Sequence, residues 1–209
     1  MNVLPAVVLR ILSYSVLSFF LLSGSSCGHE QNPTASKPSG VSDIVNAART
    51  QIGKTVSYDP GYVGLKYPNG DIDISKGVCT DVVIRALRKS RKMDLQQLVH
   101  EDMQRNFSKY PKIWGLTRTD KNIDHRRVPN LRTFFKRKGW SLPVIRKKEN
   151  YQPGDLVTCT VAGKLPHIMI VSDSVDSDGT PLVIHNIGAG AQEEARLFEF
   201  PLTGHYRIK

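Results

Sequence analysis

The spacing of hydrophobic and polar residues divides the chain into a helical first half and a stranded second half. In the first half, apolar residues recur every three or four positions, and this spacing predicts amphipathic helices. The predicted helices begin near Ser42, span Thr80 to Lys92, cover residues 94–107, and finally run over residues 128–139. Residues 54–77 are rich in turn-forming Gly, Pro, Asp and Asn, so we expect a long loop between the first two helices.

The hydrophobic pattern changes after Tyr151 to short segments rich in β-branched residues. Such segments, bounded by turn residues, are typical of strands. The predicted strands are residues 156–161, 167–172 and 181–186, with more strand in the tail over 197–208. The short connections between them favour an antiparallel sheet. Helices followed by strands predict an α+β domain in which the helices pack on that sheet.

The N-terminus reads as an export signal followed by a linker. Residues 1–27 contain one charge, an apolar run over residues 11–22, and then small residues, as a secretion signal does. A permanent anchor helix is the alternative for this apolar stretch. Cys27 follows the small residues directly, which makes it a candidate for lipidation and membrane attachment. Residues 28–41 have linker composition, so we expect a single domain over residues 42–209 in an exported protein of the periplasm or cell envelope.

The charge of the chain is concentrated in one segment. The formal net charge is +10, from 29 Lys and Arg against 19 Asp and Glu. Residues 85–148 hold 19 of these cations and only 5 of the acids, a net of +14, so the remainder is mildly acidic. A basic surface suits nucleic acid or an anionic envelope polymer. Few aromatic residues are interleaved with these charges, and an exported protein does not meet nucleic acid, so we expect an anionic envelope polymer.

Cys79 stands where the irregular loop enters the second predicted helix. A helix N-terminus carries partial positive charge and free N–H groups, which stabilise a thiolate and lower the thiol pKa. The same N–H groups can hold the oxyanion formed when a thiol attacks an amide. These features make Cys79 a candidate nucleophile. A buried structural cysteine is the alternative.

Two histidines are predicted to face each other across a hairpin. His167 opens one strand, His185 lies near the end of the next, and the loop between them is centred on Asp176. Pairing that is symmetrical about Asp176 joins residues whose numbers sum to 352, as 167 and 185 do. Their Cβ atoms would then be about 5 Å apart. This arrangement predicts a relay in which Cys79 attacks, His167 exchanges protons and His185 orients His167.

Three other interpretations of these residues stay open at this point. The histidines could simply be core residues of an amphipathic hairpin. Cys79 and both histidines could hold a metal ion, although the chain has no closely spaced CxxC or HxxxH pair, so we expect neither a metal nor another cofactor. Cys79 could instead form a disulfide with Cys159, which would silence the nucleophile, but a free buried thiol is favoured at Cys159.

Several short motifs resemble those of NlpC-type, papain-like cell-wall endopeptidases. The block YQPGDLV followed by a strand opening with His167 resembles the strand pair that leads to the catalytic histidine in that family. The resemblance implies a papain-like core, with His185 as the third catalytic residue and Tyr58 near the thiol. The residues around Cys79 depart from the usual Asp-Cys-Ser, because the chain has Val78-Cys79-Thr80-Asp81.

A second resemblance covers essentially all of the chain after residue 41. The strings GVCTD, NIDHRRVPNL, PHI and IHNIG are similar to those of the bacterial domain-of-unknown-function family 1287. Its name assigns no activity, so the resemblance implies the fold more strongly than the reaction. Within NIDHRRVPNL, Asp124 could pair internally with an arginine, or the basic residues could grip carboxylates of a substrate. The candidate substrate-binding residues are Tyr58, Asp81, His125, Arg126 and Arg127.

The sequence therefore predicts a thiol-dependent amidase or endopeptidase acting on peptidoglycan stem peptides. Cys79, His167 and His185 would carry the reaction. A non-catalytic module that binds the cell wall on the same fold is one alternative. An acyl or peptidyl transferase using the same three residues is another, because sequence does not separate transfer from hydrolysis.

Overall fold

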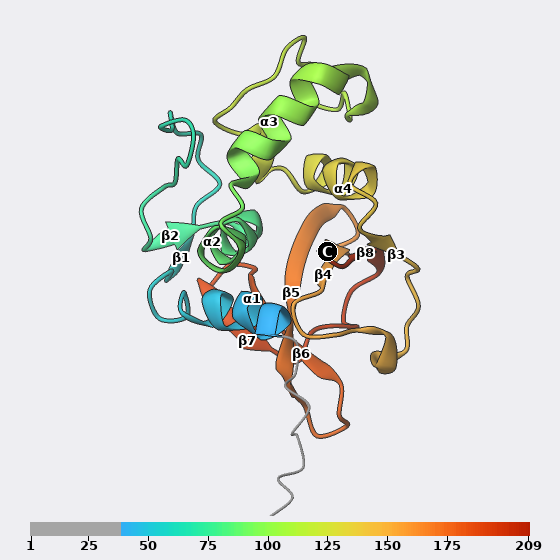
Figure 1. Ribbon diagram of the computed structural model, residues 1–209. Helices are drawn as coiled ribbons and strands as arrows, with labels where there is room; N and C mark the ends of the chain where they lie inside the picture. The colour runs from blue at the N-terminus through green and yellow to red at the C-terminus, as the bar shows by residue number, and fades with distance from the viewer. Residues whose placement is uncertain (1–38) are drawn as a thin grey trace, which may run out of the picture. The chain divides into compact units, whose positions relative to one another are not determined.

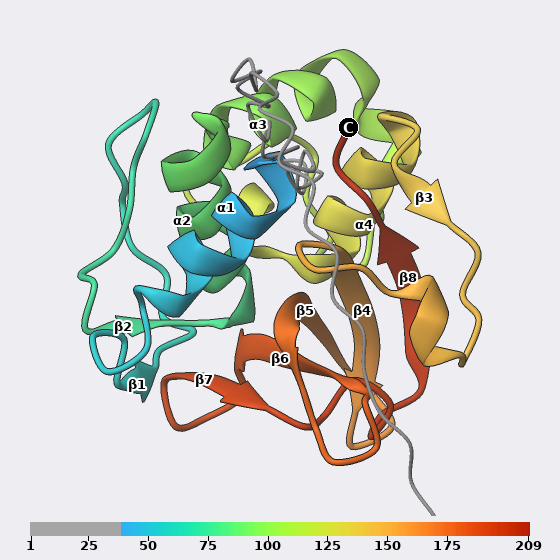
Figure 2. The same ribbon diagram turned by 60° about the horizontal axis from the view of Figure 1, so that its bottom comes forward.

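The computed structural model describes residues 39–209, in which the helices lie on one side of an antiparallel sheet (Figures 1 and 2). The predicted signal peptide, Cys27 and residues 28–38 of the predicted linker lie outside the described residues. Helix α1 (Ser39–Arg49) begins three residues before the predicted start at Ser42, so residues 39–41 are helical rather than linker. The predicted α+β fold, with the helix that starts at Cys79 packed on an antiparallel sheet, is confirmed.

The four main helices occur where the apolar spacing predicts them. They are α1, α2 (Cys79–Arg91), α3 (Leu95–Asn106) and α4 (Val128–Arg137), with short 3-10 turns η1 (Phe107–Lys109), η2 (Asp124–Arg126) and η3 (Lys148–Asn150). Helix α2 ends because Lys92 adopts a left-handed conformation with φ of 55°. In residues 39–209, none of the helices combines the length and apolar character needed to cross a bilayer.

The strands form one large sheet and one small parallel pair. The small pair is β1 (Ser57–Tyr58) with β2 (Lys76–Gly77); the large sheet contains β3 (Ser141–Leu142), β4 (Leu156–Val161), β5 (Leu165–Val175), β6 (Pro181–Asn186), β7 (Ala191–Glu194) and β8 (Leu202–Tyr206). The large sheet has the order β3-β8-β4-β5-β6-β7, with every pair antiparallel. The pattern of residues predicted β4 and β6 to the residue. It missed β7, and only residues 202–206 of the predicted tail strand are extended.

The two faces of the large sheet are covered in different ways. Ile168, Ile170 and Ile184 point toward the helices and pack in a large core with Leu87 and Leu131. On the other face, a smaller core is closed by residues of connecting loops rather than by helices; it contains Tyr151, Val157, Cys159, Met169, Val171, Val183 and Leu197. Because both faces are covered, the strands are nearly continuously apolar and form a rigid platform.

The Pro-Gly-Asp block before β4 has a structural role. Asp155 is almost fully buried and accepts hydrogen bonds from His205 Nε2 at 2.7 Å and from Arg207 Nε at 2.7 Å. The Arg207 guanidinium and the His205 ring hold the pKa of Asp155 below its usual value against the effect of burial, which would raise it. The carboxylate therefore joins the start of β4 to the C-terminal strand.

Candidate active site

Cys79 is the first residue of α2, at the position the sequence predicts. The preceding residue, Val78, is extended, and its backbone N–H donates to Asp81 Oδ2 at 2.7 Å. This bond is the second half of a capping box and fixes how the chain enters the helix. The side chain of Cys79 is directed into the protein, with the residue only 4% exposed. Within the first helical turn, the backbone N–H of Thr80 bonds the thiol.

The start of α2 lies where β5 and β6 separate. The pairing between these strands ends at Ile170 and Ile184. Beyond that point the side-chain amide of Asn186 donates to the carbonyl of Gly77 at 2.9 Å, which ties the end of β6 to the approach to Cys79. On the β5 side, the backbone N–H of Ile168 acts on the Cys79 thiol and lowers its pKa. The thiol thus lies beside the residue that follows His167.

A chain of hydrogen bonds links the two predicted histidines and continues to an acid. His167 Nε2 is 2.8 Å from His185 Nδ1, and the two rings meet edge to face. His185 Nε2 is in turn 2.9 Å from Glu194 Oε2. Both histidines are buried, whereas Glu194 is partly exposed. Glu194 thus orients the His185 ring, and His185 orients the His167 ring, as in other acid–base relays.

The predicted hairpin register is wrong by two residues. Ile170 pairs with Ile184 and Val171 with Val183, so opposite residues sum to 354 rather than 352. The turn is centred on Asp178, because Val175 pairs with Pro181, and the irregularity between Val171 and Val175 removes only part of that displacement. A shift of two residues keeps every side chain on its face, so His167 and His185 become diagonal neighbours that still reach each other.

Glu194 is the site residue that the sequence analysis missed. It belongs to β7, which pairs with β6. Glu194 lies opposite Val183 of β6, and Gln192 lies opposite His185. The signal was the glycine-rich turn before this strand. Gly190 has φ of 86°, and a Cβ there would lie 2.3 Å from the carbonyl oxygen of Thr55. Recognising a tight turn at that glycine would have placed the following acids beside β6.

Glu194 tests whether the hydrogen-bond chain has a catalytic role, because it bonds His185 and Arg196 but does not line the Cys79 pocket. Replacing Glu194 with Gln keeps the shape but removes the charge that stabilises a protonated His185, so we expect kcat to fall by about 10-fold or more with little change in KM. Steady-state kinetics on a soluble substrate measure this. The matched control is Glu193→Gln, because Glu193 is adjacent but bonds Arg49 and Ser172 instead. An equal loss in both variants would contradict a role for Glu194 in the relay.

The protonation states of Cys79 and His167 differ from the prediction. Burial raises the pKa of Cys79 to about 12, and the N–H groups of Ile168 and Thr80 only partly oppose this effect. Burial likewise lowers the pKa of His167 to about 3, with His185 adding to the shift. The expected lowering of the thiol pKa by the helix terminus is therefore outweighed. Both groups therefore rest in their neutral forms at neutral pH, and the lowered pKa makes His167 a weak base.

This electrostatic state predicts slow alkylation of the resting thiol. Only thiolate reacts, and a raised pKa leaves little of it near pH 7. The rate of Cys79 modification by iodoacetamide should rise about tenfold per pH unit up to pH 10 or beyond, as expected for titration of a single thiol below its pKa. Mass spectrometry of the Cys79 peptide measures the rate. Fast, pH-independent labelling near pH 7 would show a pre-formed thiolate instead.

A pocket of about 290 Å³ opens beside the thiol. Its walls include Cys79, Tyr58, Trp114, Arg127 and Pro166. Tyr58 is thus placed beside Cys79, as the sequence resemblance implied. Burial, and then the proximity of Cys79, raise the pKa of Tyr58 to about 12, so its hydroxyl is a hydrogen-bond donor at neutral pH. Pro166, which precedes His167 in β5, borders the pocket, whereas His167 does not and instead lies on the side of the strand that carries Cys159 and Met169.

The structure assigns Asp81 and Arg126 to an internal ion pair. Arg126 Nε and Nη2 bond the two carboxylate oxygens of Asp81 at 3.0 and 2.9 Å. The guanidinium also donates to the carbonyls of Gly61 and Asp59. Four of its five N–H donors are therefore occupied, although Arg126 also borders the pocket. The pair joins the start of α2 to the loop after Tyr58, so its main role is structural, and Asp81 does not line the pocket.

His125 and Arg127 have different surroundings. His125 is 1% exposed, lines no pocket, and has a pKa lowered to about 4 by burial, so the geometry does not support substrate contact there. Arg127 borders the Cys79 pocket, and its guanidinium lies over the Trp114 ring, 4.1 Å from the centroid. Its Nη1 is 3.8 Å from Asp124 Oδ1, so the expected internal pair is present but loose. Arg126 and Arg127 both border the pocket, but Arg127 is held less tightly by its acid than Arg126 is.

Cys79 and Cys159 are both free, so the alternative of a disulfide is not realised. Cys159 lies directly opposite His167 in the β4–β5 ladder and is buried, as expected for a structural thiol. Within residues 39–209, no group of three or more His, Cys, Asp or Glu residues is arranged to hold a metal ion. The two histidines are thus bonded to each other and to Glu194 rather than to a common centre.

Comparisons with known proteins agree with the second sequence resemblance. The model of the family described as Domain of unknown function (DUF1287) matches residues 45–208. The chain is 58% identical over 164 residues to the "Uncharacterized protein YijF" of Escherichia coli (strain K12), an alignment that covers 78% of this chain and 80% of that protein. Among solved structures, NlpC1 from Trichomonas vaginalis matches with a TM-score of 0.41 and 14% identity, over 82% of this chain. The match spans 46% of the NlpC1 chain, just under half its length.

Proposed function

The chain belongs to the family Domain of unknown function (DUF1287), and we propose that it is an exported cysteine amidase or endopeptidase that cleaves peptidoglycan stem peptides. The observation that carries this proposal is the hydrogen-bonded chain His167–His185–Glu194, which starts at the residue before Ile168, whose backbone N–H bonds the helix-initial Cys79 thiol. A nucleophile, a proton acceptor and an orienting acid are the groups that amide cleavage through an acyl-enzyme needs.

The first half of the reaction transfers the acyl group to Cys79. Because His167 Nε2 is engaged with His185, its Nδ1 is the nitrogen left to take the thiol proton. The sulfur attacks the amide carbon, and the backbone N–H of Cys79 holds the oxyanion. The C–N bond then breaks as His167 gives its proton to the departing amine, which leaves a thioester on Cys79.

The second half regenerates the enzyme. His167 takes a proton from water, the resulting hydroxide attacks the thioester, and the C–S bond breaks to release a carboxylic acid product. The thiolate recovers the proton from the imidazolium. Glu194 stabilises the positive charge that the histidine pair carries in both halves, because its carboxylate bonds His185. In this scheme both groups start neutral and charge develops only during the reaction, where the Glu194 carboxylate and the N–H groups at the start of α2 stabilise it.

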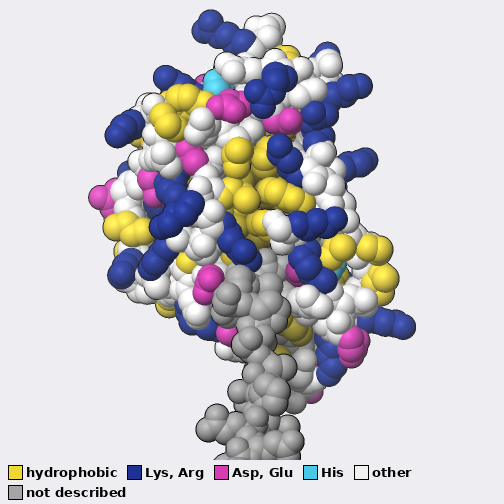
Figure 3. Space-filling model, in the orientation of Figure 1, with side chains coloured by type: hydrophobic (Ala, Val, Ile, Leu, Met, Phe, Trp, Pro, Cys, Tyr) yellow, Lys and Arg dark blue, Asp and Glu magenta, His cyan; other side chains and the backbone are white. Residues whose placement is uncertain are grey.

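The surface of the described residues supports an anionic polymer as the partner. In Figure 3, Lys and Arg side chains border a continuous hydrophobic area on the face shown, and acidic side chains are fewer there. Such a surface suits a polymer that combines anionic groups with apolar portions. The apolar N-terminal segment supports export to the periplasm or cell envelope, and Cys27 is the proposed lipid attachment site.

The proposal is tested by incubating the purified protein with sacculi and with defined muropeptides. We expect products that carry one added water and a new pair of amine and carboxyl ends, identified by mass spectrometry. Products joined to another amine without added water would show that the protein is a peptidyl transferase. Binding to sacculi with no product would identify the non-catalytic cell-wall module, which the 4% exposure of Cys79 favours as the second candidate.

A further inference from the structure

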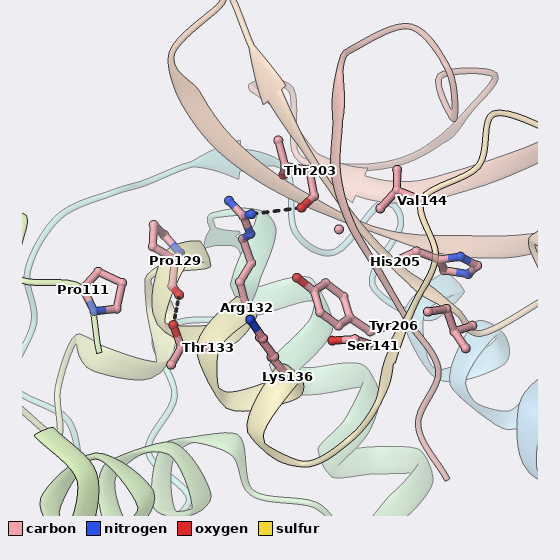
Figure 4. A pocket seen from close by; sticks show the side chains of 12 residues that line it. Pro111, Pro129, Arg132, Thr133, Lys136, Ser141, Val144, Thr203, His205 and Tyr206 are labelled. Carbon is pink, nitrogen blue, oxygen red and sulfur yellow. Dashed lines mark hydrogen bonds between the residues drawn. The ribbon is translucent and has the colours of Figure 1, made fainter. Parts of the chain in front are cut away.

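A second hollow lies between α4 and the sheet edge formed by β3 and β8 (Figure 4). We name it the α4 pocket. Its volume is about 440 Å³, larger than the pocket at Cys79. Its lining includes Pro129, Arg132, Lys136, Ser141, Thr203 and Tyr206. Pro129 also borders the Cys79 pocket, so the two hollows are neighbours on opposite sides of one residue at the start of α4.

The α4 pocket is positively charged. Arg132 and Lys136 are one helical turn apart, so both project from the same face of α4 into the hollow (Figure 4). None of the residues that line it is Asp or Glu. Arg132 Nη2 donates to the backbone carbonyl of Thr203 at 2.9 Å, which fixes the guanidinium against β8. Among residues 39–209, no acid pairs with either cation, so both charges are available to a ligand.

We propose that the α4 pocket binds a carboxylate of the same peptide whose amide is cleaved at Cys79. This inference rests on the proposed function, because it takes the Cys79 pocket as the place of the scissile bond. An anchored guanidinium offers paired N–H donors that match a carboxylate, and Lys136 adds a second charge. The hydroxyls of Ser141 and Tyr206 line the same hollow and supply neutral donors. A peptide crossing Pro129 would thus occupy both hollows and be held in register with the thiol.

Binding to an uncleavable complex tests the inference. Cys79→Ala protein in its full-length form is titrated with soluble muropeptides by calorimetry, and its Kd is compared with that of Cys79→Ala carrying Arg132→Gln and Lys136→Gln. We expect the double change to weaken binding by at least 10-fold. Lys136→Gln alone, which removes no hydrogen bond of the fold, should weaken binding by several-fold. Muropeptides whose carboxyls have been amidated should bind equally weakly to every form.

Matched controls separate this site from general attraction between opposite charges. Lys54→Gln with Lys209→Gln removes the same charge from exposed residues that line neither hollow, and should leave Kd within twofold. Equal weakening by both pairs, undiminished binding of amidated muropeptides, or no binding at all would each overturn the inference. Competition by inorganic phosphate but not acetate would also overturn it, in favour of a phosphoryl ligand. Cleavage of sacculi by the protein with Cys79 intact is scored separately, so either proposal can fail alone.

Discussion

Replacing Cys79 with Ala is expected to lower muropeptide release from purified sacculi by at least about 1,000-fold. The reason is chemical, because removing the sulfur removes the atom that forms the acyl-enzyme. The fold should survive, since Ala fits the space of a buried Cys at the first position of a helix. Release is measured by chromatography of soluble products. Unfolding curves of both proteins confirm that the loss is not a folding defect.

Cys159→Ala provides the matched control for that loss. Both thiols are buried and both have a pKa raised to about 12, chiefly by burial. They differ in position, because Cys159 lies within β4 and does not border the Cys79 pocket. Cys159→Ala should therefore retain activity within a few-fold. Retained activity in Cys79→Ala with loss in Cys159→Ala would move the nucleophile to the sheet, where Cys159 faces His167 across the ladder.

Replacing Arg126 with Gln is expected to reduce the free energy of unfolding by about 3–5 kcal/mol. The substitution leaves the Asp81 carboxylate buried without its cation, and it also removes the bonds to the carbonyls of Asp59 and Gly61. Activity should fall as well, because these bonds position the loop that carries Tyr58 beside Cys79. Urea denaturation followed by circular dichroism measures the stability change.

Two further variants identify the cause of that loss. Asp81→Asn combined with Arg126→Gln should cost less than the sum of the two single changes, because the pair is coupled. Arg105→Gln removes an exposed pair with Glu101 and should cost at most about 1 kcal/mol. A similar small cost at Arg126 would show that the buried pair contributes no more than a surface one.

Features that depend on neighbouring residues were predictable from the sequence. The apolar spacing of residues 80–92 and the short β-branched run of residues 156–161 are local patterns, so both elements were located within one residue or better. The position of Cys79 at a helix start follows from the same local pattern. His167 and His185 were placed on one face because strand alternation has a period of two, which survived the wrong register.

Features that depend on distant residues were not predictable in this way. Glu194 reaches His185 only because β7 folds back along β6, and the sequence analysis had not recognised that strand. Arg126 was assigned to substrate, but its carboxylate partner Asp81 lies 45 residues earlier in the chain. Local spacing does not report such pairing, since it arises where the start of α2 meets the distant 3-10 turn η2.

The sequence by itself determined the α+β order of elements, the helix-initial thiol and the two histidines on a common face. Only the tertiary structure decided the charge state of the site, the acid that completes the relay, and which arginine is held tightly by a buried acid. The physical reason is that periodicity is a local property of the chain, whereas burial and charge pairing depend on everything packed around a group. For Cys79 these effects act in opposite directions, and burial outweighs the helix terminus.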